Sequence, residues 1–478
     1  MNEYQNSSSE EIALTNRSML SKGHNIPVET QSFHKSFGFI NITTYIIIVS
    51  FISGLYSLCS LAFIIYQKDT LKLSPQTVQF YTGIIIMPWS VKPLFGYVID
   101  KILVRVKKVK YILAISSISR LVVFLTLTYA NLSLPYLYAL LSINQISAVV
   151  ESILAEYSLV LKTKEHNKKD NKEQNNQLPI YFGFRSVGAL IGNFLGGRII
   201  QSFSPQMTFF ICIFFPFITL FCTICYKEKY VEKEVSYKNI LEDIRGLFSV
   251  FKFSRVAPLL VLVCLLIATP DFGTLTTFYI TDHLGFSTTD LANFASFGTI
   301  CSIVGQYLYY HYLVKINPRL FFLTTCLIFW IINNSFLLVV FEIAQNLGVS
   351  AKIVIMLIQG ATVFLLEMVF MPIITVWISI MPKQLEATSI TLITGLINFS
   401  ANFSAYFGAY LMVLLGIEDK NYNELWKLLV IQSVYYFIIL LFLFRTSFPT
   451  VQNDKRENDE EIKTLSTFEI EELSNKIN

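Results

Sequence analysis

The sequence predicts an all-α, polytopic membrane protein with twelve transmembrane helices in two six-helix halves. Of its 478 residues, 53% are hydrophobic and only 15% are charged, whereas a soluble domain carries about 25% charged residues. The mean hydropathy is +0.54. The short-range alternation of apolar and polar residues that a membrane β-barrel needs is absent from the sequence. A helical membrane protein is therefore the expected fold class.

Twelve apolar stretches are each long enough to cross a bilayer, since about 20 apolar residues span the hydrocarbon core as a helix. They lie at approximately 39–66, 76–99, 110–130, 133–161, 179–203, 207–226, 255–281, 287–312, 318–342, 349–377, 385–416 and 423–446. A charged connection divides them six and six. The expected domains are a polar cytoplasmic tail (1–38), a first bundle (39–226), a cytoplasmic linker (227–254), a second bundle (255–446) and a charged cytoplasmic tail (447–478).

The connections between these stretches differ in charge. Lysine and arginine gather in three of them, Lys101–Lys110, Lys162–Lys172 and Lys227–Arg255. Positive loops stay on the cytoplasmic side, so we expect both termini inside. The plasma membrane is the expected location, with an organellar membrane as the alternative. The net charge of +4 reflects these loops and predicts no nucleic-acid partner.

Cysteine and histidine give little indication of metal or redox chemistry. All seven cysteines fall within the apolar stretches, and Cys222-x-x-Cys225 has no second pair to complete a metal site. The five histidines fall in tails, loops or the ends of stretches. We therefore expect packing roles for the cysteines, no metal, no cofactor and no enzymatic activity.

Small residues recur at helical spacing in two of the stretches. Gly188, Gly192 and Gly196 leave one face of the fifth stretch bare, and Gly298 and Gly305 do the same in the eighth. Such faces let helices approach closely. They indicate either static packing or a smooth contact between two halves that rock.

Seven charged residues away from the outer ends of the apolar stretches are candidates for function, because a charge inside a membrane usually faces a cavity or a partner. They are Lys92, Arg120, Glu151, Glu156, Arg185, Asp271 and Glu367. Glu156 and Arg185 are near enough to the inner surface to reach water. Asp271 follows Pro270 and could cap a broken helix. The sequence leaves open whether the deeper charges pair with each other or with a ligand.

A candidate inner gate follows the second stretch. Gly96-x-x-x-Asp100, followed by Lys107, resembles the loop signature of the major facilitator superfamily. An aspartate there can pair with a helix N-terminus or a cation, which would hold the cytoplasmic side shut. Glu386, at the inner mouth of the eleventh stretch, is assigned to the same gate.

Longer strings carry a closer resemblance. "MPWSVKPLFG" (Met87–Gly96) and "VVESILAEYS" (Val149–Ser158) belong to the first half. "FRSVGALIGNFLGG" (Phe184–Gly197), "TPDFGTLTTFYITDHLGFS" (Thr269–Ser287) and "MPIITVWISIMPKQLEATSI" (Met371–Ile390) follow. Together these strings resemble the folate–biopterin transporter family over about residues 40–445. The resemblance implies a major facilitator fold and transport of folate or pterin compounds by alternating access.

Site residues are assigned on this basis. Lys92, Arg120 or Arg185 could hold the glutamate tail of a folate, and Glu151 or Glu367 could accept from the N–H groups of the pterin ring. Asn398 lies on a polar face of the eleventh stretch and is expected to contact substrate. Because no Na⁺ site or ATP-binding motif is evident, the carboxylates Glu151, Glu367 and Asp271 are expected to couple transport to protons.

Three alternatives remain open at this stage. The same fold could carry another small organic anion, such as a p-aminobenzoate-like precursor or an amino-acid or nucleoside derivative. An integral-membrane enzyme would need a nucleophile or metal cluster at membrane depth. A channel is disfavoured by the prolines and glycines spread over both halves, which are typical of helices that move.

Overall fold

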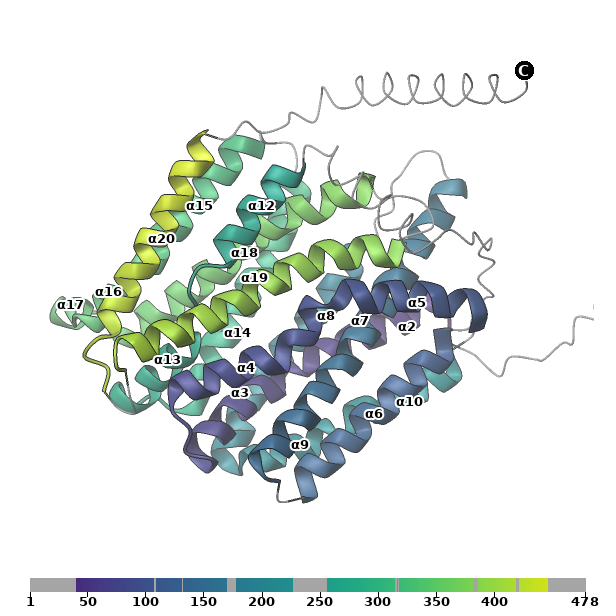
Figure 1. Cartoon of the computed structure of the whole chain (residues 1–478), viewed down its shortest axis with the longest axis horizontal. Helices are drawn as coiled ribbons and strands as arrows, with labels where there is room; N and C mark the ends of the chain where they lie inside the picture. The colour runs from purple at the N-terminus through teal and green to yellow at the C-terminus, as the bar shows by residue number, and fades with distance from the viewer. Residues whose placement is uncertain are drawn as a thin grey trace, which may run out of the picture. The chain divides into compact units, whose positions relative to one another are not determined.

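The computed structural model describes residues 40–106, 109–130, 132–169, 178–226, 256–313, 316, 318–380, 386–417 and 421–445, and this part of the chain is almost entirely helical. The first group of helices is α2 (Ile42–Leu55), α3 (Ser57–Ile65), η1 (Tyr66–Thr70), α4 (Pro75–Ser90), α5 (Lys92–Val106), α6 (Val109–Tyr129), α7 (Leu134–Lys169), α8 (Leu178–Ser202), α9 (Pro205–Cys212) and α10 (Phe214–Cys225) (Figure 1). The second group is α12 (Val256–Ile267), α13 (Gly273–Phe278), η2 (Tyr279–His283), α14 (Thr288–Leu308), η3 (Tyr309–Leu313), α15 (Pro318–Asn334), α16 (Leu337–Val340), α17 (Ile343–Asn346), α18 (Ala351–Ile380), α19 (Glu386–Leu414) and α20 (Leu425–Arg445).

Eight helical segments in the described residues are long and apolar enough to cross a membrane. Helices also occupy the other four predicted stretches, as α8, the pair α12 and α13, α14 and α19. These are interrupted, or carry glycine, serine, asparagine or charged residues that lower their hydropathy. Segments of α8, α13 and α14 line the cavity described below, which explains their more polar composition.

The outward faces of the helices are apolar. On α6, Tyr111, Ile115, Ile118 and Val122 are exposed at spacings of three and four residues, whereas Phe124, on the opposite face, is buried. In water such a stripe would be strongly unfavourable, but in a bilayer it contacts lipid tails. The chain is a multi-pass integral membrane protein.

The glycine-lined faces pack within each group of helices. An added Cβ at Gly188 or Gly192 would overlap the backbone of α2 or the turn that follows it, and one at Gly196 would press on Leu58 of α3. Gly298 and Gly305 of α14 face side chains of α18. These five glycines therefore do not lie at a contact between the two halves, and their positions agree with the alternative of close helix packing. Close approach is what the absent Cβ permits.

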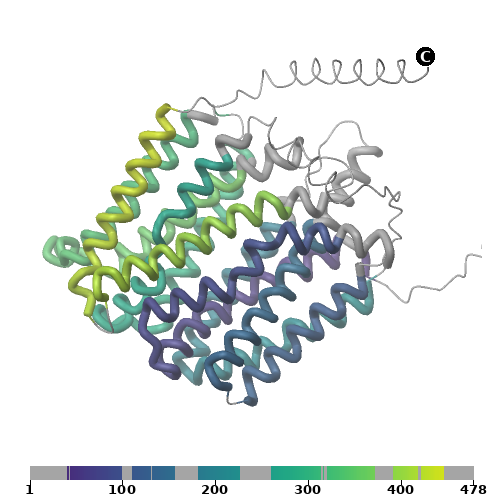
Figure 2. The backbone as a smooth tube through the Cα atoms, viewed as in Figure 1, coloured from purple at the N-terminus to yellow at the C-terminus, as the bar shows by residue number. Residues whose placement is uncertain are grey.

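The two most extensive contacts between the first and second groups of helices involve α14 and α19. The helix α8 packs along α14, and α4 with α5 packs along α19 (Figures 1 and 2). Hydrogen bonds cross both contacts: Asn193 donates to Thr299 at 3.0 Å, and Asn402 donates to Ser90 at 2.5 Å. These contacts join the two groups of helices.

The ends of the first and seventh predicted spans have the same local structure. Each closes with a five-residue π-helical turn, η1 or η2, followed by a short extended link and the next helix. In η1, the Leu71 N–H donates to the Tyr66 carbonyl at 3.1 Å. In η2, the Leu284 N–H donates to the Tyr279 carbonyl at 3.2 Å. The two turns therefore use one hydrogen-bonding pattern.

The sequences of the two turns agree with this match. Both read Tyr-x-x-Asp-x-Leu, then one residue with positive φ, an apolar residue and a serine. The residue with positive φ is Lys72 (55°) in the first turn and Gly285 (67°) in the second. Glycine adopts this conformation without strain, whereas lysine does so only where the surroundings impose it. The shared conformation supports an internal repeat.

Candidate functional site

A cavity of about 390 Å³ lies between helices of the first and second groups. This volume is in the range of small-molecule sites in proteins. Its polar lining comes from α3, α8, α13, α15, α18 and α20, and from Asp271, two residues before α13. These polar residues are Ser57, Ser60, Asn193, Asp271, Thr276, Thr277, Asn333, Gln359, Thr362 and Gln432.

A broken helix forms one wall of the cavity. Pro270 lacks the N–H that would continue α12 into α13, and the exposed backbone is satisfied by side chains of other helices. Gln79 of α4 donates to the Asp271 carbonyl at 2.5 Å, and Gln432 of α20 donates to the Pro270 carbonyl at 3.0 Å. The Ser404 hydroxyl donates to the Thr269 carbonyl. Irregular backbone at membrane depth needs such partners.

Asp271 is held at the break by its own chain. Its Oδ1 accepts the Gly273 N–H at 2.9 Å, so it caps the broken helix as the sequence indicated. The residue is nevertheless exposed, because it lines the cavity. Within the described residues it has no salt-bridge partner. The carboxylate is therefore available to a ligand.

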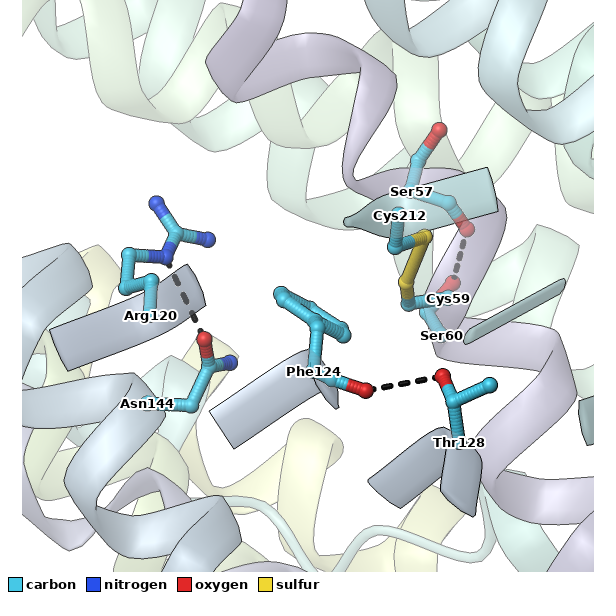
Figure 3. The surroundings of a disulfide bond; sticks show 8 residues. All are labelled: Ser57, Cys59, Ser60, Arg120, Phe124, Thr128, Asn144 and Cys212. Carbon is cyan, nitrogen blue, oxygen red and sulfur yellow. Dashed lines mark hydrogen bonds between the residues drawn. A yellow bond between two sulfur atoms is a disulfide. The ribbon is translucent and has the colours of Figure 1, made fainter. Parts of the chain in front are cut away.

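Arg120 and Glu151 form a buried ion pair between α6 and α7. The Arg120 Nη1 donates to Glu151 Oε2 at 2.6 Å, and its Nε donates to Asn144 at 3.2 Å (Figure 3). The guanidinium also lies 3.6 Å from the centre of the Tyr56 ring, a favourable cation–π geometry. The Ser117 hydroxyl donates to the other Glu151 oxygen at 3.3 Å. Both charges are thus satisfied by the protein.

Lys92 is paired in the same way between α5 and α7. Only 1% exposed, its Nζ donates to the two Glu156 oxygens at 2.8 and 2.9 Å and to Ser152 at 3.3 Å. Its ammonium lies 5.6 Å from the centre of the Trp89 ring. A buried ammonium needs such a set of acceptors. The Lys92–Glu156 ion pair thus links α5 to α7.

The remaining candidates for substrate contact lie on three other helices. Arg185 is half-buried on α8, and Asn398 is half-buried on α19. Glu367 of α18 accepts from the Ser302 hydroxyl of α14 at 2.7 Å. None of these residues lines the cavity, and neither do Lys92, Arg120 or Glu151. Of the predicted site residues whose side chains the structure describes, only Asp271 lines the cavity.

A further ion pair joins the two repeated turns and was not assigned from the sequence. Lys68 of η1 contacts Asp282 of η2 at 2.5 Å and donates to Thr281 at 2.7 Å. The Tyr422 hydroxyl of the second group donates to the other Asp282 oxygen at 3.1 Å. The repeated Tyr-x-x-Asp motif is the signal that could have found it.

The predicted inner gate falls largely on residues whose side chains are not described. Gly96 is a buried residue of α5, Asp100 belongs to the same helix, and Glu386 begins α19. The side chains of Asp100 and Glu386 and the whole of Lys107 lie outside the described part of the structure. The gate therefore stays a prediction.

Two of the seven cysteines form a disulfide, and the other five are free. Cys59 of α3 and Cys212 of α9 are joined by a disulfide (Figure 3), a pairing that the sequence did not indicate. Cys222 and Cys225 are buried and reduced. Within the described residues, no cluster of histidine, cysteine and carboxylate side chains could hold a metal ion.

The helical fold is one that solved membrane transporters share. The structure is similar to the nucleoside transporter NupG, with a TM-score of 0.61 at 12% identity over 85% of this chain and 100% of that one. It is also similar to a D-xylose-proton symporter, with a TM-score of 0.58 at 12% identity over 85% and 98% of the two chains.

The sequence comparison places the chain more narrowly. Residues 53–465 match the BT1 family, and the protein belongs to that family. It is 24% identical to folate transporter 1 of Plasmodium falciparum over 83% of this chain and 78% of the relative. It is 21% identical to the folate-biopterin transporter of Synechocystis over 83% and 80%. The resemblance found in the motifs is confirmed.

Proposed function

We propose that this protein is a secondary transporter that moves folate- or pterin-type compounds across a membrane by alternating access. The moving parts are two six-helix halves, residues 39–226 and 255–446, and both termini are cytoplasmic. The observation that carries the proposal is the cavity, because helices of both halves contribute to it and a broken helix brings Asp271 into its wall. The substrates named for the BT1 relatives support the choice of compound.

Gates at the two ends of the cavity complete the mechanism. At the end formed by η1 and η2, the Lys68–Asp282 pair joins residues of opposite halves, so it breaks when the halves part there. At the cytoplasmic end, Gly96, Asp100, Lys107 and Glu386 remain our proposal for the opposing gate. Alternating access requires that one gate open while the other stays closed.

Protons are the proposed coupling ion. Of the three carboxylates assigned to coupling, Asp271 has direct access to the cavity, Glu151 is paired with Arg120, and Glu367 accepts from Ser302. Asp271 is therefore favoured as the group that exchanges a proton in step with substrate. The other two contribute only if their partners separate during the cycle.

Uptake into liposomes tests the proposal. Purified protein should give saturable uptake of folic acid, biopterin or both, with counterflow by unlabelled substrate, and p-aminobenzoate completes the panel. An inside-alkaline gradient should drive accumulation above equilibrium, and a protonophore should abolish it. A folded protein that moves none of the panel would exclude this substrate class, whereas uptake without counterflow would favour a channel.

A further inference from the structure

The charge inventory of the cavity limits what it can bind. Asp271 is the only ionisable side chain among the described residues that line it. The buried cations Lys92 and Arg120 are each held by a carboxylate of α7 and do not reach the cavity. An anionic group entering the cavity therefore meets one carboxylate and no cation.

The hydroxyl groups of the wall present acceptors. Four of them donate their proton to a backbone carbonyl: Ser57 to Ala189, Ser60 to Ser57, Thr276 to Phe272 and Thr277 to Gly273. Each bond is between 2.7 and 3.0 Å long. Since a hydroxyl has one proton and two lone pairs, each oxygen can still accept a hydrogen bond from a ligand.

The amides of the wall are similarly arranged. Asn193 donates to Thr299 at 3.0 Å, Asn333 donates to the Phe329 carbonyl at 2.8 Å, and Gln432 donates to the Pro270 carbonyl. Each amide thus uses one of its two N–H groups within the protein and keeps its oxygen as an acceptor beside one further N–H. The cavity is rich in acceptors and fits a ligand rich in N–H donors.

Resting on the proposed function, we infer that the cavity recognises the adjacent N–H donors of a 2-amino-4-oxopteridine ring through Asp271 and prefers unconjugated pterins to folates. The 2-amino group and the neighbouring ring N–H point the same way and match the two oxygens of a carboxylate. Hydrogen bonds to an ionised acceptor are the strong ones. The glutamate tail of a folate adds negative charge where the wall offers no compensating cation.

Equilibrium binding to the full-length protein in nanodiscs tests the inference. The probes are 6-hydroxymethylpterin, 6-hydroxymethyllumazine and folic acid, because the first two differ only in an amino or an oxo group at position 2. Loss of one hydrogen bond to a charged partner weakens binding about tenfold to hundredfold. We expect the pterin to bind more tightly than the lumazine by that factor, and more tightly than folic acid.

Substitution of Asp271 tests whether its carboxylate causes the preference for pterin over lumazine. Asp271→Asn should weaken pterin binding about tenfold or more and should reduce the difference between pterin and lumazine to less than threefold. Asp69→Asn is the matched control, since Asp69 lies outside the cavity with a side chain that is 57% exposed. It should leave all three affinities unchanged.

The outcomes separate this inference from the proposed function. If the lumazine or folic acid binds as tightly as the pterin, the inference is wrong while the transport proposal stands. If Asp271→Asn retains the full pterin preference, another group recognises the ring. If Asp271→Asn does not fold, the ratio of the pterin and lumazine dissociation constants on the unaltered protein still tests the inference, and equal constants would contradict it. If no probe binds and none is transported, the proposed function itself fails.

Discussion

The ion pair between the two repeated turns offers a direct test of alternating access. Lys68 and Asp282 belong to opposite halves of the chain. Asp282→Asn keeps the size of the side chain and its bond from Tyr422 but removes the attraction to Lys68. The equilibrium should move toward the conformation in which the η1–η2 end is open.

The structure sets the size of this shift. The side chains are 12% and 23% exposed and their charged atoms are 2.5 Å apart, so the pair lies between the exposed and the buried cases. Exposed pairs contribute about 0.2–1 kcal/mol, and breaking a buried pair costs about 3–5 kcal/mol. We expect about 1–3 kcal/mol, which corresponds to about a 5- to 150-fold change in the ratio of open to closed states.

Thiol labelling measures the change. Ser60 is exposed to the cavity on α3, and Ser60→Cys can be labelled by a membrane-impermeant maleimide when the η1–η2 end opens. Asp282→Asn should increase the rate at which Cys at position 60 is labelled at least fivefold. The background rate, measured on protein that keeps Ser60, is subtracted first. Asp69→Asn makes the same charge change 3.8 Å from Lys68 and should have little effect. Equal rates in the two variants would refute the gate.

Two further predictions concern packing and pairing. Glu151→Gln leaves the buried Arg120 guanidinium without its anionic partner and should lower the free energy of unfolding by about 3–5 kcal/mol. The double variant with Arg120→Gln should recover part of this loss, and unaltered denaturant unfolding of the single variant would contradict it. Gly408→Ala places a Cβ against the Asp271 carbonyl and should cost about 1–3 kcal/mol, with loss of transport. Gly183→Ala is the control, because a Cβ at Gly183 has no atom within 4 Å, and it should leave stability and transport unchanged. Equal losses in the Gly183→Ala and Gly408→Ala variants would exclude the steric explanation.

The membrane class and the helices could be predicted because both depend on local composition. Runs of about 20 apolar residues identify a membrane helix without reference to the rest of the chain. The broken helix was also indicated, since Pro270 cannot donate the hydrogen bond that would continue α12. These features follow from residues that are adjacent in the sequence.

The pairing of the buried charges could not be predicted, because it depends on how distant helices are rotated against one another. Lys92 and Glu156 are 64 residues apart, and nothing in either stretch fixes which neighbour each faces. The same limit applied to the glycines of α8, whose spacing indicates close packing but not the partner helix. The cavity escaped prediction for this reason, since it is assembled from segments distributed between Ser57 and Gln432.

These arrangements bring recognition and gating onto one short segment. Asp271 lies just before α13, and Asp282 lies in η2, which continues α13 without a break. The continuous helical rod Gly273–His283 therefore begins two residues after Asp271 and contains Asp282. A ligand that contacts Asp271 and tilts this rod also moves Asp282 relative to Lys68. The break at Pro270 separates this rod from α12, and side chains of α4, α19 and α20 donate hydrogen bonds to the carbonyls of the break. In the transport cycle that we propose, substrate binding and the opening of one gate are therefore coupled through the seventh predicted span.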